Sequence, residues 1–290
     1  MPASYELHEH PPLVAPAMIV ALEGWIDGGF AAARAAQTLL DELDTTPVAT
    51  FDADELLDHR ARRPVLHLVD GVNTAMSWPG IELRAATDEG GNDLLLLVGA
   101  EPDHSWRAFT EAVIALAQQL GCRMIVGLGA YPAATPHTRA TRLSVTASTE
   151  ELAISSGLLR GTLDVPAGVQ AAIERRCADA GIAAMGIWAQ IPHYASGMAY
   201  PAGGRALIEQ LQRVAGLSLP MGTLVDESRE TQERLDAIIA GNDDHAAMVR
   251  QLEEEVDSHE DAGPMPPGPL PSGDDLVAEL ERYLRDQGKD

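Results

Sequence analysis

The chain holds only two cysteines in 290 residues, Cys122 and Cys177. Both lie in apolar or helical segments, so two buried thiols of a cytosolic protein explain them better than a single disulfide, which their number would also permit. Neither cysteine belongs to a zinc-ligand pattern. We therefore expect no metal, no cofactor and two unreactive thiols.

Lysine is rarer still, because Lys289 stands alone against 19 arginines, and the formal net charge is −24. Such an excess of acid excludes the basic face that nucleic-acid binding requires and disfavours anionic membranes. No apolar run reaches the roughly 18 residues that a bilayer span needs. The first residues, MPASYELHEHPP, lack the basic and apolar stretches of a signal peptide. The composition predicts a cytoplasmic protein that binds neither nucleic acid nor membrane.

The acidic residues are unevenly distributed. Residues 223–290 hold 19 acids and 6 bases, whereas residues 1–222 hold 25 acids and 14 bases. This shift predicts a core domain over residues 1–218 and an acidic helical region over residues 219–290. Within the second region we expect helices at 223–240, 243–257 and 274–286, and a proline-rich linker at 261–273.

Apolar runs alternate with helical periodicity through the first domain. Strand-like runs occupy residues 17–23, 47–51, 64–71, 81–86, 93–99, 122–129, 142–148 and 182–192. Helical patterns occupy residues 28–43, 104–120, 169–181 and 203–216. Alternation of this kind predicts a three-layer α/β/α sandwich around a mostly parallel sheet. Segment 60–91 interrupts the alternation, and we expect it to contain a β-hairpin insertion.

Five of these strands end in polar or glycine-rich turns. The carboxyl ends of parallel strands meet at one edge of a sheet, which is where ligands bind in open α/β folds. We expect one ligand-binding cleft there, with no catalytic residue assigned. Its residues are Glu23, Asp27, Gly28, Gly29, Glu101, His104, His137, Arg139, His193 and Tyr194.

The turn GWIDGG at residues 24–29 has two interpretations. The backbone N–H groups of Gly28 and Gly29, at the start of a helix, are able to bind an anion. Their spacing, however, matches neither the Walker motif nor GxGxxG. In the second interpretation the turn is merely tight, and Asp27 is the N-cap of the helix that follows.

Two other turns are equally open to interpretation. His104 lies at a helix start, where a neutral histidine would serve as an acid or base, but the adjacent Asp103 or Ser105 also predicts a simple cap. Arg139, in the segment PHTRATR, suits a carboxylate or phosphate, which is either a ligand or one of the protein's own acids. Tyr194 either faces the cleft or packs under the helical tail.

Catalytic signatures are missing from the sequence. The chain contains no GxSxG, HExxH or CxxC motif. Cys177 lies within a helical pattern and has no neighbour that would activate its thiol. The sequence therefore favours a protein without enzymatic activity.

The chain carries five motifs in a fixed order: LEGWIDGG, DHRARRP, GAEPDHSW, GLGAYP with PHTR, and IPHY followed by YP. Together they resemble the proteasome assembly chaperone family, and most closely its actinobacterial members. The resemblance covers the chain from about residue 14 to the tail. It implies a core similar to purine nucleoside phosphorylase and peptidyl-tRNA hydrolase, a homo-oligomer expected to be a trimer, and a lid of C-terminal helices.

Two functional hypotheses follow. In the first, the protein is a non-enzymatic assembly or interaction protein, with a proteasome-related or other protein as its partner. In the second, it is an enzyme or small-ligand binder of the phosphorylase or hydrolase type. Arg139 and the turn at Gly28 and Gly29 would then hold an anionic substrate in the cleft.

Overall fold

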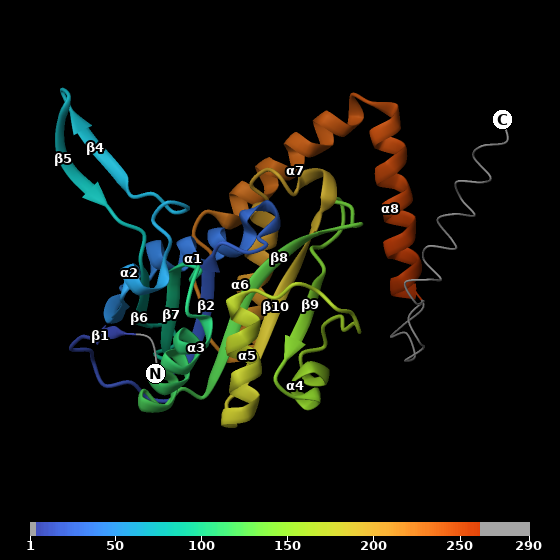
Figure 1. Cartoon of the computed structure of the whole chain (residues 1–290). Coiled ribbons are helices and arrows are strands. Elements are labelled where there is room, and N and C mark those ends of the chain that lie inside the picture. The colour runs from blue at the N-terminus through green and yellow to red at the C-terminus, as the bar shows by residue number, and fades with distance from the viewer. Residues whose placement is uncertain (1–3, 262–290) are drawn as a thin grey trace.

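Four apolar strands lie side by side at the centre of an eight-stranded sheet (Figure 1). The computed structural model describes residues 4–261. The four strands run parallel in the order β7 (Asp93–Ala100), β2 (Ala17–Glu23), β8 (Met124–Ala133) and β10 (Ala183–Pro192). Helices cover both faces of this sheet, which explains why the strands read as continuous apolar runs.

Antiparallel strands extend the sheet at both edges. On one side β9 (Leu143–Ala147) pairs with β10. On the other side the order continues from β7 through β6 (Ile81–Thr87), β3 (Thr46–Phe51) and β1 (Tyr5–Leu7). The predicted three-layer α/β/α sandwich with a mostly parallel sheet is confirmed, and the antiparallel strands are additions at its margins.

The first face of the sheet is covered by α1 (Ala31–Glu42) and α6 (Pro201–Ala215). A short turn of 3₁₀-helix, η1 (Gly28–Phe30), leads from β2 into α1. The two helices approach closely because α6 presents glycines: a Cβ on Gly203 would lie 2.8 Å from Cβ of Ala31. Alanine-rich and glycine-rich sequences in these helices therefore reflect packing.

The second face is covered by α3 (Trp106–Gln119) and α5 (Val169–Ala180), with the short α2 (Ala53–Leu56) at its margin. The helix expected over residues 104–120 is present as α3, and its apolar face is buried: Phe109, Val113 and Leu116 are at most 1% exposed. Burial of three such side chains stabilises the fold by about 1.5–3 kcal/mol each.

A two-stranded hairpin projects from the sandwich (Figure 1). Its strands are β4 (Val65–Val69) and β5 (Val72–Ser77), and every residue of both is exposed. The hairpin insertion expected within segment 60–91 is therefore present. Its second strand is not 81–86, which joins the main sheet as β6, but the less apolar segment 72–77, whose side chains face solvent on both sides.

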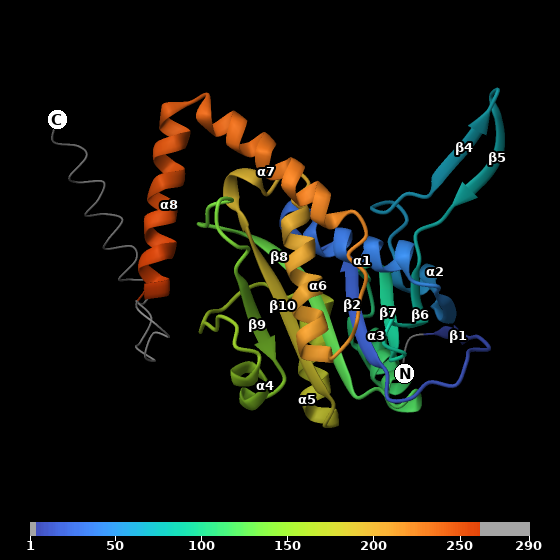
Figure 2. The same cartoon turned by 180° about the vertical axis from the view of Figure 1, so that it is seen from behind.

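The C-terminal part of the described chain is helical. Helix α7 (Leu224–Ala240) packs on α6, and α8 (Asp243–Asp261) turns back beside the loop that follows β8 (Figure 2). The small elements α4 (Glu150–Ser155) and η2 (His193–Ala195) complete the fold. Asp261, the first residue of the expected linker at 261–273, ends α8. The rest of that linker and the expected helix at 274–286 lie outside the described residues, and the domain division at residue 218 stays a prediction.

None of the helices described between residues 4 and 261 is both long enough and apolar enough to cross a bilayer.

Candidate functional site

A cavity of about 290 Å³ opens at the carboxyl ends of the central strands. It lies between the N-termini of α1 and α5, which cover opposite faces of the sheet, so it occupies the position where ligands bind in open α/β folds. Its lining includes the side chains of Glu23, Trp25, Asp27, Phe30, Glu101, Gln170 and Trp188.

Asp27 caps the helix that follows it. Its Oδ1 accepts a hydrogen bond from Ala32 N and its Oδ2 one from Ala33 N, each over 2.9 Å. Burial raises the pKa of this carboxyl group, although these backbone N–H groups act in the opposite direction. Asp27 therefore serves the backbone of its own helix, as in the capping interpretation, while it also lines the cavity.

The two glycines after Asp27 allow close packing. A Cβ on Gly28 would lie 3.1 Å from the carbonyl carbon of Tyr131, and one on Gly29 would lie 2.6 Å from Cβ of Tyr200. Gly29 has a φ of 63°, and its N–H donates to Ser196 O over 2.8 Å. The Gly29 N–H is therefore bound within the protein, so it is not available to an anion.

Glu101 is the most buried carboxylate of the cavity, with 7% of its surface exposed. Its Oε1 accepts a hydrogen bond of 2.6 Å from Val169 N, the first residue of α5. Glu23, at the end of β2, is exposed beside it. The two helix N-termini at the cavity are thus each paired with one of the protein's own carboxylates.

Aromatic side chains form the rest of the cavity wall. Trp25 and Phe30 are 47% and 56% exposed, and Phe30 has a φ of 53°, which is unusual for a bulky residue. The indole of Trp188 packs against Gly129 of β8, where a Cβ would come within 2.4 Å of the ring. Gly129 therefore makes room for the Trp188 indole.

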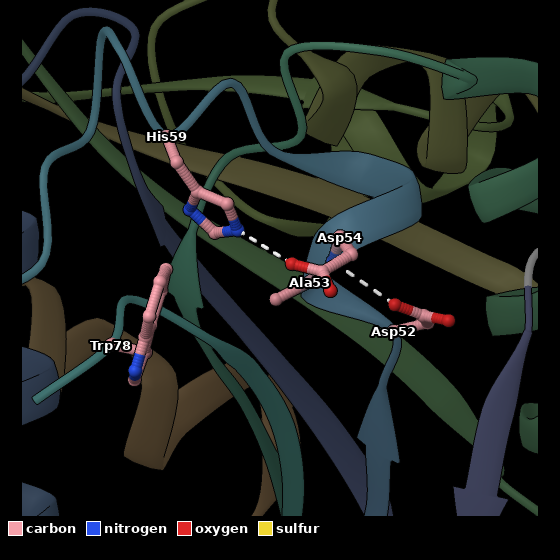
Figure 3. Close-up of a pocket in the computed structure, with 5 residues that line it drawn as sticks. All are labelled: Asp52, Ala53, Asp54, His59 and Trp78. Carbon is pink, nitrogen blue, oxygen red and sulfur yellow. Dashed lines mark hydrogen bonds and ion pairs between the residues drawn. The ribbon is translucent and has the colours of Figure 1, made fainter.

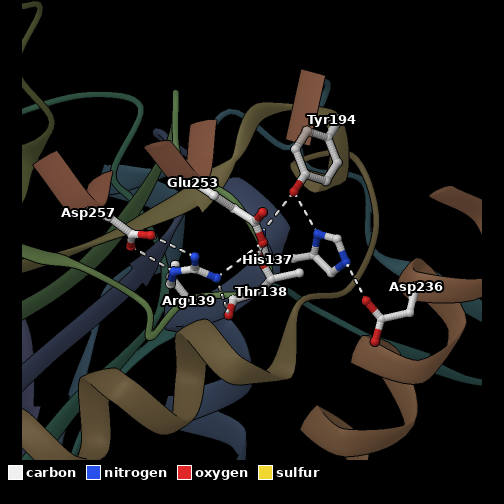
Figure 4. Close-up of polar contacts among 7 residues, drawn as sticks. All are labelled: His137, Thr138, Arg139, Tyr194, Asp236, Glu253 and Asp257. Carbon is white, nitrogen blue, oxygen red and sulfur yellow. Dashed lines mark hydrogen bonds and ion pairs between the residues drawn. The ribbon is translucent and has the colours of Figure 1, made fainter. Parts of the chain in front are cut away.

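Three of the expected site residues belong to a second group of polar contacts, shown in Figure 4. The hydroxyl of Tyr194 accepts from His137 N over 2.8 Å and contacts His137 Nδ1 at 2.7 Å. The other ring nitrogen, Nε2, lies 3.1 Å from Asp236 Oδ1 on α7. The side chain of His137 is only 1% exposed. This histidine therefore joins the loop after β8 to η2 and α7.

Arg139 continues the same group toward α8 (Figure 4). Its guanidinium donates twice to Asp257 and once, over 3.1 Å, to Glu253 Oε1. Thr138 also donates to Glu253. The partner of Arg139 in this structure is therefore the protein's own acidic helix, one of the two possibilities left open by the sequence.

The ten residues that we expected to share one cleft therefore lie in three separate places. Glu23, Asp27 and Glu101 line the cavity, and Gly28 and Gly29 shape the turn beside it. The second group holds His137, Arg139 and Tyr194, with the exposed His193 ring 5.3 Å from that of Tyr194. His104 is exposed near α2, to which its N–H donates. Sequence reasoning missed Trp25, Phe30, Gln170 and Trp188.

Those four residues carried a partial signal in the sequence. Trp25 and Phe30 flank Asp27 within the turn that was singled out, but an apolar side chain in a loop predicts burial as readily as a binding surface. Gln170 and Trp188 lie in a helix and a strand whose periodicity predicts only their secondary structure. Their convergence depends on the sheet order.

The hairpin base holds a further cavity, of about 310 Å³ (Figure 3). His59 Nε2 lies 2.9 Å from Asp54 Oδ1, and the ring of Trp78 packs edge-on against the imidazole. Asp52 is engaged in capping α2, where it accepts from Asp54 N and Glu55 N. The shallow arrangement offers one histidine and no nucleophile beside it.

Both thiols are free, as expected: Cys177 is buried and Cys122 half-buried. Burial raises the pKa of each to about 12, which keeps the thiols protonated and unreactive at neutral pH. Across residues 4–261, no three His, Cys, Asp or Glu side chains are grouped closely enough to hold a metal ion.

Comparison with known proteins identifies relatives along most of the chain. The model of the PAC2 family matches residues 21–239. A comparison with curated proteins finds no match. Among solved structures, a Mycobacterium tuberculosis protein of unknown function is 36% identical, with a TM-score of 0.83, over 90% of this chain and 93% of its own.

Two further structures extend this result. A Corynebacterium glutamicum protein of unknown function is 30% identical, with a TM-score of 0.84, over 90% of this chain and 99% of its own. A Mycobacterium tuberculosis proteasome-assembly chaperone homologue is 30% identical, with a TM-score of 0.74, over 80% of this chain and 99% of its own. The resemblance inferred from the five motifs is confirmed, and the chain belongs to the PAC2 family.

Proposed function

We propose that this protein is a non-enzymatic assembly or interaction protein that acts on proteasome-like complexes in the cytoplasm. One observation carries the proposal: a relative 30% identical over 80% of the chain is a proteasome-assembly chaperone homologue. The family match, over residues 21–239, includes the hairpin, the sheet from the end of β2 onward and all but the last residue of α7.

The state of the polar groups supports a role without catalysis. His137 and Arg139, two of the residues expected at the site, are held by Asp236, Asp257 and Glu253. A catalytic group must be free to reach a substrate, whereas these side chains connect parts of the same chain. Their arrangement favours a structural function.

The exposed hairpin supports a role in binding. The hairpin carries apolar side chains that face solvent: Val65, Leu66, Leu68, Val69, Val72 and Met76 are 42–62% exposed. Contiguous apolar surface of this kind marks protein–protein contact. We propose that the hairpin binds a second copy of the chain and builds a homo-oligomer, a trimer being the expected state.

Native mass spectrometry of the purified protein tests the oligomer. We expect a mass of three chains for the wild type and a smaller species when Leu68 and Val72 are both replaced by serine. Ile154→Ser is the control, because Ile154 is also exposed, at 55%, but lies on α4. A wild-type monomer, or a trimer that survives the double substitution, would count against the hairpin contact.

Affinity purification from the native host tests the partner. A tagged chain should retain proteasome subunits or their precursors at a stoichiometry that survives washing in moderate salt. The L68S/V72S variant distinguishes direct contact by the hairpin from contact elsewhere. Recovery of the tagged protein with no stable partner would argue against an assembly role.

A second function is favoured by the cavity of about 290 Å³ between α1 and α5. Its size lies at the lower limit of small-molecule sites, about 300–1,000 Å³, and its position is the usual one in this class of fold. We propose, as the alternative function, that the protein binds a small ligand there. Crystals soaked with a fragment library would test it, because an empty cavity throughout would oppose ligand binding.

A further inference from the structure

The charge of the cavity is set by carboxylates that outnumber the positive groups around it. The N-termini of α1 and α5 contribute about half a positive charge each. One carboxylate apiece already offsets them, because Asp27 accepts from Ala32 N and Ala33 N, and Glu101 accepts from Val169 N. Glu23 adds a further negative charge. No lysine, arginine or histidine is among the residues that line the cavity.

One basic side chain, that of Arg62, lies beside the cavity but is engaged in other contacts. Arg62 lies beside Gly24 and donates to Asp103 over 3.1 Å and to the carbonyl of Glu23 over 3.3 Å. Asp103 neutralises this guanidinium, so the excess of negative charge at Glu23 and Glu101 remains. An anionic ligand would meet repulsion here, whereas a cation would be attracted.

Glu101 retains an unused oxygen in this environment. The residue is more than nine-tenths buried, and its Oε1 is bound to Val169 N. Among the described residues no N–H or O–H group donates to Oε2, and this oxygen is not one of the side-chain atoms that are buried without a partner. Oε2 is therefore accessible, and a charged donor of a ligand would bind it.

The aromatic residues complete the recognition of a cation. Any side chain at position 168 would come within 3.0 Å of both Glu101 Oε1 and Trp25 Cδ1, so the carboxylate and the indole face the same space. An indole face attracts an ammonium group within about 6 Å of its centroid. Phe30 adds exposed apolar surface at the same mouth.

Gln170 adds a hydrogen-bond donor to the charged and aromatic groups of the cavity. The side-chain amide Nε2 of Gln170 is buried beside the cavity and has no acceptor among the described residues. The amide lies over Gly127, so a carbonyl or hydroxyl oxygen of a ligand would accept from it once the side chain rotates toward the cavity. The cavity thus offers a site for an ammonium, an aromatic surface for an apolar group, and a donor for an acceptor atom.

We propose that this cavity binds a primary-ammonium cation that carries an apolar group and a hydrogen-bond acceptor. The proposal rests on the alternative function, ligand binding in the cavity, and not on the assembly role. It reverses the charge that the sequence led us to expect. The cation is either a free amino compound or the amino terminus of a polypeptide, since both present the same ammonium and carbonyl groups.

Calorimetric titration of the full-length protein at pH 6.5 tests the charge, because α-amino groups are mostly protonated there. The probes are phenylalaninamide, N-acetylphenylalaninamide and N-acetylphenylalanine, which share the benzyl and carbonyl groups and carry charges of +1, 0 and −1. We expect saturable binding of phenylalaninamide, at least about tenfold tighter than that of the other two.

Two variants locate the site. Glu101→Gln keeps an acceptor for Val169 N and removes the charge, and we expect it to weaken phenylalaninamide binding about tenfold or more. Trp25→Ala removes a half-exposed side chain without disturbing the core and should also weaken binding. Glu233→Gln, the same change at an exposed position of α7, should leave the affinity unchanged.

The outcomes separate the two proposals. Equal or tighter binding of the neutral or anionic probe would overturn the cation assignment and leave ligand binding in place, whereas no binding of any probe would overturn both. Undiminished affinity in both E101Q and W25A would also overturn the assignment. A hexapeptide with a free amino-terminal Phe, compared with its acetylated form, identifies the source: binding of the free form indicates a polypeptide terminus, and binding of phenylalaninamide alone indicates a small amine.

Discussion

Arg139 and Asp257 form a two-pronged ion pair, in which Nε and Nη2 of the guanidinium each donate to a different carboxylate oxygen over 2.8 Å. The residues are 118 positions apart, so the pair joins the loop after β8 to the end of the described chain. The hydrogen bond from Arg139 lowers the pKa of the Asp257 carboxyl group. Such pairing gives α8 (Asp243–Asp261) a fixed place beside the sheet.

Arg139→Ala should therefore loosen α8 without unfolding the core. We expect faster amide hydrogen exchange over residues 243–258 and unchanged exchange in the central strands, because local stability follows local contacts. Hydrogen–deuterium exchange with mass spectrometry provides the measurement. Arg175→Ala, which removes a pair with Asp179 within α5, is the control. Identical exchange of α8 in R139A and wild type would show that apolar contacts alone hold the helix.

Tyr194→Phe tests the other half of the same attachment. The Tyr194 hydroxyl hydrogen-bonds both His137 N and His137 Nδ1, and the imidazole is only 1% exposed. Removing the hydroxyl therefore leaves both of these buried nitrogens without a partner. We expect a loss of about 1–3 kcal/mol in the free energy of unfolding, measured by urea denaturation. The matched control is Tyr5→Phe, because Tyr5 is a half-buried tyrosine on the edge strand β1. A loss no larger than that of the control would contradict the role assigned to the hydroxyl.

The sequence predicts the helices and strands of this molecule more successfully than the contacts between residues far apart in the chain. Residues 17–23 and 169–181 were predicted from local patterns and agree with β2 and α5 within one residue. Burial on both faces of a strand, or along one face of a helix, leaves a periodic record within a short window. Strand β5 (Val72–Ser77) left no such record, because the exposed hairpin has no buried face.

The candidate site was harder to predict for a different reason. The residue type of Arg139 indicates a carboxylate or phosphate partner, but many acids of the tail are equivalent in sequence, and only the fold selects Asp257 and Glu253. Glu101 and Trp25 meet because β7 and β2 are neighbours. The sheet order determines such meetings, and the sequence pattern specified the strands without their order.

Gly129→Ala should displace Trp188 from the wall of the cavity. A Cβ at this position would lie 2.4 Å from the indole, far inside van der Waals contact, so the ring must move. We expect a destabilisation of about 1–3 kcal/mol and altered tryptophan fluorescence. Gly197→Ala is the control, since a Cβ there meets no atom within 4 Å. Unchanged fluorescence and stability in G129A would show that the indole moves aside at no cost.

Asp88→Asn should weaken the join between the β6–β7 turn and the segment after α6. Burial acts to raise the pKa of Asp88, but the N–H groups of Ser218 and Asn92, at 2.6 and 2.7 Å, outweigh it and lower the pKa below the ordinary 3.8. The ionised Asp88 carboxylate therefore stabilises the fold above pH 3.8, and this contribution is lost as the pH falls through the lowered pKa. Thermal melting of D88N should therefore differ most from wild type near neutral pH and least in strong acid.

Asp27→Asn should change the pH dependence in the opposite direction. Burial raises the pKa of Asp27 above the ordinary 3.8, so the folded protein binds the proton more tightly than the unfolded chain. Its contribution to stability is therefore fully present below pH 3.8 and declines as the pH rises through the folded-state pKa. Asparagine does not titrate, so the difference in unfolding free energy between wild type and D27N should vary with pH in this sense.

The magnitude and sign of that difference follow from the cap. Asparagine offers one carbonyl oxygen where Asp27 offers two, to Ala32 N and Ala33 N, so D27N should lose about 0.5–2 kcal/mol from α1. That loss should be largest in acid, where the wild type still has the contribution of the bound proton, and smaller at neutral pH. Urea denaturation at pH 3.5, 5 and 7 measures both the size of the stability loss and its change with pH. A loss that grows from acid to neutral pH would contradict this expectation. It would mean that the N–H groups of Ala32 and Ala33 stabilise the ionised carboxylate by more than burial destabilises it.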